Sequence, residues 1–210
     1  MKKIITSLLS IVAALAIALA VGMGLASIAS QPVLAAAGDT VSFNLVASPG
    51  VKSCLANKLP YGRATISDLG PVQNMHVEVF NLPGKAEFAL FVIQVPNKPF
   101  GLAWYQADIE TNSSGHGVAD VTGIFSQGTF TLAPGVAPAP KIFPDDAIIN
   151  PATPPVQINH LGIWFGDPLV AEAAGCPNTV TPFESNHHAG IQVLNTGNYP
   201  DTKGPLQLLH

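Results

Sequence analysis

Histidines and carboxylates in the last third of the chain are the side chains whose types could support metal chemistry. His160 begins an apolar run, Asp167 follows just beyond it, and Glu184, His187 and His188 share a polar segment. Two imidazoles and a carboxylate suit Zn²⁺ or Cu²⁺. Because adjacent residues of an extended chain point to opposite faces, at most one of the two neighbouring histidines would join such a site. We expect these histidines to hydrogen-bond locally or face water, and a Zn or Cu site is the alternative hypothesis.

Motifs of nucleophilic and phosphate chemistry do not occur in the sequence, which has no Gly-x-Ser-x-Gly elbow, zincin helix or glycine-rich phosphate loop. Carboxylates at Glu78, Asp108, Glu110 and Asp120 could in principle form the pair of a glycoside hydrolase. Carboxylates on strands more often keep an outer face soluble. We therefore expect no catalytic residues and no resident cofactor, and favour a protein that is not an enzyme.

Neighbouring aromatic side chains at Trp104 and Tyr105 could line a groove for a carbohydrate or a peptide. Aromatic residues on strands more often belong to the core, and we expect these two to be buried. A carbohydrate-binding or carbohydrate-active domain is a second alternative function.

The export signal is the segment 1–37. Lys2 and Lys3 precede a long uncharged apolar run, and the small residues 35–37 are of the kind that signal peptidase accepts. A retained membrane anchor is the alternative, since the run is long enough to cross a bilayer. Cleavage would leave 173 residues, enough for one domain with its own core.

The charge of the mature chain is low and acidic. Loss of the two signal lysines leaves seven basic residues against thirteen acidic ones, a net charge of −6. Nucleic acids and anionic lipids are held chiefly by clustered Lys and Arg, and no such cluster occurs. We expect an unidentified extracellular or envelope partner, no nucleic acid, and no membrane contact after cleavage.

The chain has two cysteines, Cys54 and Cys176. An even pair in an exported chain usually forms a disulfide because the compartment is oxidising. We predict a Cys54–Cys176 bridge, with two free thiols as the alternative.

Frequent prolines and alternating apolar runs predict a mainly β fold, an antiparallel β-sandwich or barrel-like domain with long Pro-rich loops and one short helix. The expected strands are 41–47, 63–67, 76–81, 87–95, 102–110, 118–125, 129–132, 156–165 and 190–194. The segment 102–125 is expected to be a β-hairpin. Asp167 followed by Pro168 is typical of a helix start, and Gly175 of its end.

Seven prolines fall within residues 133–155. So proline-rich a stretch could be a linker between domains, but the 55 residues after it would make a weak independent core. We favour a Pro-rich excursion within a single β-rich domain, 38–210.

Segments of the last third, His160–Phe165, Ala174–Cys176, Thr181–Phe183 and His187–Thr196, resemble a family of secreted bacterial proteins that is uncharacterised. The resemblance implies secretion from a bacterium and no activity. Gly175-Cys176 followed by His187–Gly190 is also faintly similar to the metal loop of copper–zinc superoxide dismutase. Only His76 matches that family's copper pair, so we do not expect dismutase activity. The expected function is thus a secreted or envelope-associated binding or structural module.

Overall fold

The structure is a computed structural model of the chain, and it describes residues 40–132, 155–184 and 187–209. These residues fall within one compact unit, 35–210. The expected signal peptide (1–37), and all but the last residue of the expected Pro-rich excursion (133–155), lie outside the described residues. None of the described helices is long and apolar enough to cross a membrane.

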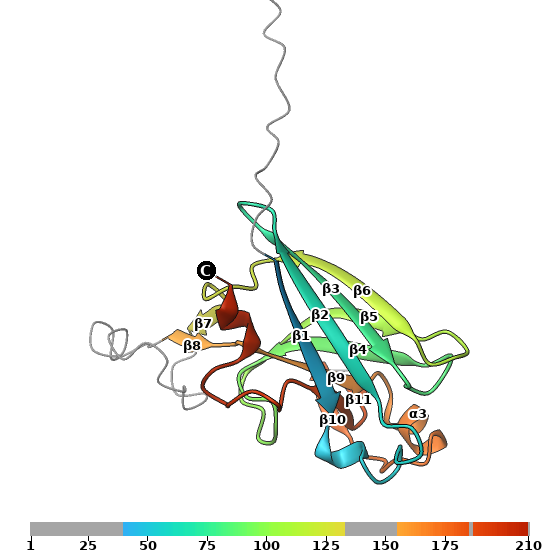
Figure 1. Cartoon of the computed structure of the whole chain (residues 1–210). Helices are drawn as coiled ribbons and strands as arrows, with labels where there is room; N and C mark the ends of the chain where they lie inside the picture. The colour runs from blue at the N-terminus through green and yellow to red at the C-terminus, as the bar shows by residue number, and fades with distance from the viewer. Residues whose placement is uncertain (1–39, 133–154, 185–186, 210) are drawn as a thin grey trace, which may run out of the picture. The chain divides into compact units, whose positions relative to one another are not determined.

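The expectation of a mainly β fold is confirmed, because eight described strands form one antiparallel sheet that curls into a nearly closed barrel (Figure 1). In spatial order these strands are β5 (Ala103–Glu110), β4 (Glu87–Ile93), β9 (His160–Phe165), β12 (Gln192–Asn195), β1 (Thr40–Ala47), β2 (Tyr61–Asp68), β3 (Gln73–Phe80) and β6 (Gly117–Gly123). The two end strands, β5 and β6, follow one another in the chain.

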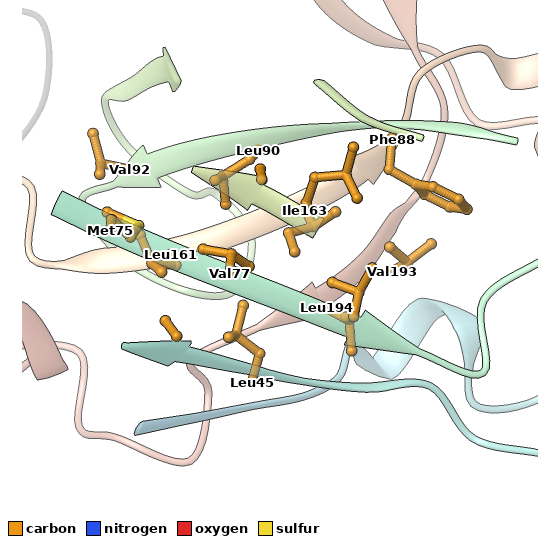
Figure 2. Packing of buried hydrophobic residues seen from close by; sticks show 14 of the residues in the cluster. Leu45, Met75, Val77, Phe88, Leu90, Val92, Leu161, Ile163, Val193 and Leu194 are labelled. Carbon is orange, nitrogen blue, oxygen red and sulfur yellow. The ribbon is translucent and has the colours of Figure 1, made fainter. Parts of the chain in front are cut away.

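The core fills the inside of this sheet. Along β1 buried residues alternate with more exposed ones, as the period of two in a half-buried strand requires. Figure 2 shows side chains from several strands meeting in this interior, among them Leu45, Met75, Leu90 and Ile163. All four are at most 1% exposed. Strand β9 differs because all six of its residues are buried, so its outer face is covered as well.

The expected hairpin 102–125 is wrong in its pairing. Strands β5 and β6 flank a turn, but among the described residues they meet at a single bridge, between Thr111 and Gly117, while β5 pairs with β4 and β6 with β3. The reason is that the segment before β4 bonds into the turn. Leu82 N donates to Gly115 O at 3.1 Å, and Lys85 N donates to Thr111 O at 3.1 Å. The turn therefore sends its two strands to opposite edges of the sheet.

The expected strand 156–165 is divided in two because its halves have different partners. Strand β8 (Pro155–Gln157) pairs with β7 (Phe130–Leu132), whereas β9 pairs with β4 and β12. The expected strand 190–194 also differs, since β11 (His187–Ala189) pairs with β10 (Thr181–Glu184) before β12 begins at Gln192.

Short helical segments complete the described fold. Helix α3 (Pro168–Ala173) begins as predicted, with the Asp167 carboxylate accepting a hydrogen bond from Leu169 N at 2.6 Å. Two 3₁₀ turns, η1 (Pro49–Val51) and η2 (Pro205–Leu208), follow β1 and end the described chain.

The predicted Cys54–Cys176 disulfide is present, with the two Cα atoms 5.0 Å apart. Cys54 belongs to the connection between β1 and β2, and Cys176 follows α3. The bridge joins residues separated by 122 positions, so it ties an early loop to the last third of the chain. Such a bond fits a protein that folds in an oxidising compartment.

Candidate functional site

His160 is the buried member of the predicted metal set. Its Nδ1 lies 2.9 Å from the Thr196 hydroxyl oxygen, and its Nε2 lies 3.2 Å from the Asp201 carbonyl oxygen. The carbonyl can only accept, so Nε2 carries the proton and the neutral ring accepts from Thr196 at Nδ1. Both nitrogens therefore have protein partners, and a metal at His160 would have to displace one of them.

Burial lowers the pKa of His160 from its ordinary value of 6.5, because desolvation disfavours the charged ring. The carbonyl and the charge of Asp201 oppose this shift without outweighing it. The ring is thus held neutral, in keeping with its role as a hydrogen-bonding residue at the start of β9.

The other predicted ligands are spread over three elements. Asp167 caps α3, and His188 on β11 is exposed. The backbones of Glu184 and His187 pair across β10 and β11, while their side chains lie outside the described residues. Among the described side chains, no three His, Cys, Asp or Glu residues gather into a group that could hold a metal. The Zn or Cu hypothesis stays a prediction.

A cluster of aromatic rings lies instead on the outer face of β4 and β9. Phe91 and Trp164 meet edge to face with ring centroids 5.3 Å apart, and Phe100 meets the same indole at 5.1 Å. Tyr105 on β5 contacts Phe91 at 5.8 Å. We call these four residues the aromatic cleft. Gly162 lets the indole lie flat along β9, since a Cβ there would fall 2.7 Å from Trp164 Cη2.

A β-bulge brings Tyr105 to this face. Leu90 pairs with Ala107, but the next residue, Phe91, pairs with Tyr105, so Gln106 is the extra residue. The Gln106 amide donates to the carbonyls of its two preceding neighbours, at 3.2 and 3.0 Å. Strict alternation would have placed Tyr105 on the same face as Ala107; the bulge moves it beside Phe91 on the outer face.

The expectation that Trp104 and Tyr105 belong to the core is wrong. Trp104 is 61% exposed and Tyr105 is 38% exposed. Both lie on β5, a strand that ends the sheet and has a hydrogen-bonded neighbour on one side in the described sheet. Because an edge strand has a neighbouring strand on one side, fewer residues are available to bury a large ring. The other tryptophan, Trp164 on β9, is the buried one.

Phe100 reaches the cleft from the loop between β4 and β5. Its φ angle is +62°, a left-handed conformation that costs a non-glycine residue about 1–2 kcal/mol. Three backbone hydrogen bonds hold this conformation, from Phe100 N to Asn97 O at 2.8 Å, from Val95 N to Phe100 O at 3.0 Å, and from Gly101 N to Pro99 O at 2.8 Å. The Lys98–Pro99 peptide bond in the same loop is cis. The left-handed φ of Phe100 is thus a strained conformation at the residue whose ring contacts Trp164.

Buried amide side chains anchor this loop to the sheet. Gln192 Nε2 and Asn195 Nδ2 both donate to the Pro96 carbonyl, at 3.1 and 2.9 Å, and Asn195 also donates to Gln192 Oε1 at 2.9 Å. On the other side Gln94 Oε1 accepts from Leu102 N at 3.1 Å. Because these amides are 1–5% exposed, their hydrogen bonds act in a low-dielectric setting and fix the loop.

Two adjoining cavities flank the Phe100–Trp164 pair. One is about 390 Å³ and is mostly apolar, with Ser48, Asn97, Lys98 and Gln192 among its lining residues. The second is about 200 Å³ and is also mostly apolar, lined by Phe91, Pro99, Ala103, Pro182 and Ala189 among others. Phe100, Trp164 and Thr181 line both. The cleft therefore has two compartments that meet at the indole.

The indole of Trp164 carries a polar group without a partner. The side chain is 3% exposed, and Nε1 is buried with no hydrogen-bond partner among the described residues. Leaving a buried donor unsatisfied costs about 1–3 kcal/mol, so native proteins rarely do so without reason.

A second aromatic group, which we call the aromatic row, lies on the outer face of β2 and β3. The rings of Tyr61 and Phe80 stack at 4.9 Å with an angle of 15°, and His116 continues the row at 4.9 Å from Phe80. Tyr61 is 51% exposed. A shallow cavity of about 530 Å³ lies beside it, lined by Val46, Leu59 and Pro60 among others. The rings of the row contact one another, and the His116 side chain is 35% exposed.

Several residues of the cleft carried little signal in the sequence. Phe100 falls between two expected strands, Gln192 falls within the expected strand 190–194, and Asn195 falls just beyond it. One signal was available, because a run as apolar as His160–Phe165 is buried on both faces, and something must cover its outer face. The loop 96–101 is part of that cover.

No protein-family model matches the chain, and no curated protein or solved structure matches it either. The resemblance to a family of secreted bacterial proteins stays a prediction. What this chain does must therefore be argued from the cleft itself.

Proposed function

We propose that this chain is an exported, non-catalytic binding domain of the cell envelope or its surroundings, and that its ligand site is the aromatic cleft. The observation that carries the proposal is the pair of cavities, of about 390 and 200 Å³, that share Phe100 and Trp164 in their walls. Ligand sites are typically concave and mostly apolar, with a few placed polar groups. The cleft has this character.

The contents of the cleft support binding rather than chemistry. The titratable group among the residues that line the two cavities is Lys98, which is exposed. The remaining polar groups are amides and hydroxyls, which recognise ligands by hydrogen bonds but do not act as general acids or bases near neutral pH. Rigid anchoring of Phe100 through the loop reduces the entropy that the protein loses on binding.

Occupancy of the cleft can be tested with the apolar dye anilinonaphthalene sulfonate. The chain has two tryptophans, so in a Trp104→Phe background energy transfer to the dye reports on Trp164 alone. We expect saturable binding of one dye per chain, weakened at least tenfold by Phe100→Gly. Glycine tolerates the left-handed backbone at that position, so this variant removes the ring without adding strain.

The matched control is Tyr61→Ala, which removes an exposed ring from the aromatic row. It should leave dye affinity within twofold of the unmodified protein. Equal dye affinity in the Phe100→Gly variant and the unmodified protein would overturn the cleft as the ligand site.

Export has its own test. Expressed with its own N-terminus in a bacterial secretion host, the chain should be recovered outside the cytoplasm with residues 1–37 removed. N-terminal sequencing of the recovered protein should begin at Gly38. Recovery of the uncut, reduced chain from cytosol would contradict export.

A further inference from the structure

The charge of the aromatic cleft restricts the ligands that it can take. Among the described residues that line its two cavities there is one charged side chain, Lys98, and no Asp or Glu. The chain as a whole has thirteen acidic residues against nine basic ones. The cleft is thus a positively charged site on an acidic protein, and it favours a negatively charged ligand over a cationic one.

The ammonium group of Lys98 is available to such a ligand. Lys98 is exposed, and its side chain has no ion pair or hydrogen bond within the part of the chain that the structure describes. It lies two residues before Phe100 in the loop 96–101, which the buried amides of Gln192 and Asn195 hold by a backbone carbonyl. The backbone of Lys98 is therefore fixed beside the larger cavity, while its flexible side chain can turn toward an anion.

Two hydroxyl groups of the larger cavity are already engaged within the protein. The Ser48 hydroxyl donates to Gln192 O, and the Thr181 hydroxyl donates to Gly190 O at 2.8 Å. Because each hydroxyl has a single hydrogen, neither has another to donate to a ligand. A sugar would bury many hydroxyl groups against these mostly apolar walls, and their desolvation is unfavourable. A ligand with one polar end and an apolar body avoids that penalty.

The apolar body of such a ligand has two compartments to fill. Lys98 lines the larger cavity, whereas Phe100, Trp164 and Thr181 line both cavities. A chain whose charged end lies at Lys98 therefore passes these shared residues before it reaches the smaller cavity. Each methylene group that is buried in this way should tighten binding about threefold to fourfold.

We propose that the aromatic cleft binds an unbranched alkyl carboxylate, with the carboxylate paired with Lys98 and the alkyl chain packed against Phe100 and Trp164. This inference rests on the proposed function, because it names the ligand class of the same site. The dye anilinonaphthalene sulfonate shares the essential chemistry, since it combines an apolar body with one negative charge.

The probes are octanoate, decanoate, decan-1-ol and decyltrimethylammonium, each used below its micelle concentration to displace the dye from the Trp104→Phe protein. Near neutral pH the carboxylates are ionised. Decanoate should bind roughly tenfold more tightly than octanoate, which is two methylenes shorter. It should also bind about threefold more tightly than decan-1-ol and at least tenfold more tightly than the cation. Equal affinity of octanoate and decanoate, or of decanoate and decan-1-ol, would overturn the proposal.

Variants of Lys98 separate the charge from the apolar contacts. Lys98→Gln should weaken decanoate about threefold to fivefold, the upper part of the range for an exposed ion pair, and should leave decan-1-ol within about twofold. Lys98→Arg keeps the charge and should bind decanoate within about twofold of the unmodified protein. The matched control is Lys58→Gln, since Lys58 is exposed and lines neither cavity. A loss of decanoate affinity no greater in Lys98→Gln than in Lys58→Gln would overturn the proposal.

A ring variant distinguishes this inference from the proposed function. Phe100→Gly should weaken decanoate and decan-1-ol alike by at least tenfold, because both place an alkyl chain against the ring. If the dye saturates the cleft and decanoate does not displace it, the ligand class is wrong and the binding site stands. If neither the dye nor any alkyl probe binds, the proposed function itself is overturned.

Discussion

The aromatic cleft and the aromatic row are built on the outer face of the same sheet, yet they differ in burial. In the cleft, Trp164 is 3% exposed beneath the loop 96–101. In the row, Tyr61 is 51% exposed and its ring stacks flat on Phe80. The difference lies in what covers each group. The loop 96–101, which the buried amides hold in place, covers Trp164. The row lies on strands whose outer residues are more exposed.

This contrast shows where the fold departs from regular cross-strand pairing. Stacked aromatic rings on paired strands are an ordinary cross-strand stabilisation, and the register alone pairs Tyr61 with Phe80. The cleft needs more, namely a bulge at Gln106, a left-handed Phe100 and a buried amide network. Features that cost free energy and cluster in one place are more informative about function than rings that stabilise each other locally.

The largest effect on both regions should come from breaking the disulfide. Cys54 lies in the connection that leads to Tyr61, and Cys176 precedes Thr179 and Thr181 at the cleft. In the chain-entropy model, a bridge over so long a loop contributes about 5 kcal/mol. We expect Cys54→Ser/Cys176→Ser to lower the free energy of unfolding by about 3–5 kcal/mol in urea denaturation. A loss below about 1 kcal/mol would mean that the bridge constrains the unfolded chain little.

Ring removal should separate the cleft from the row. Phe91 is half-buried between two aromatic rings, so Phe91→Ala should destabilise the protein by about 2–3 kcal/mol. Tyr61→Ala removes a half-exposed ring with one stacked partner, and should cost about 0.5–1 kcal/mol. Urea denaturation of both variants gives the difference. Equal costs would contradict the contrast in burial on which the comparison depends.

Most strands were predictable because their side chains obey the period of two, as the buried and exposed residues of β1 do. The cap at Asp167 and the disulfide were predictable for equally local reasons, a preferred capping residue and an even cysteine count. The β5–β6 hairpin was predicted wrongly, because hydrogen bonds from Leu82 and Lys85 separate its strands. Such bonds form between segments that are distant in the sequence, so the local pattern of residues does not predict them.

The candidate site was largely invisible to the sequence for the same reason. Alternation placed Tyr105 on the wrong face, because a bulge at Gln106 leaves no mark in the pattern of apolar residues. Phe100 falls between the expected strands 87–95 and 102–110, and its contact with Trp164 joins residues 64 positions apart in the chain. The predicted histidines drew attention by their residue type, but His160 is occupied in hydrogen bonds with Thr196 and Asp201.

Gly162 offers a way to disturb the cleft without removing any ring. A Cβ at this position would lie 2.7 Å from Trp164 Cη2 and 2.8 Å from Ile93 Cδ1, closer than real side chains approach. We expect Gly162→Ala to displace the indole and to destabilise the protein by about 1–2 kcal/mol. In the Trp104→Phe background, Trp164 emission should shift to longer wavelength as the ring meets water. Unshifted emission would mean that the indole has room to move within the cleft.

The smallest effect should come from one proton on His160, at the other end of β9 from Trp164. Because burial lowers the pKa of His160, the unfolded chain binds this proton at a higher pH than the folded chain does. The neutral His160 makes its full contribution to the free energy of unfolding above pH 6.5. That contribution falls as the pH drops from 6.5 to the lowered pKa of the folded state. Urea midpoints of the unmodified protein and of His160→Gln, measured from pH 7.5 to about pH 5, test this. The unmodified protein should lose more stability on acidification than the variant. Parallel curves would mean that folding does not change the pKa of His160, and would leave the burial of β9 without a pH-dependent consequence.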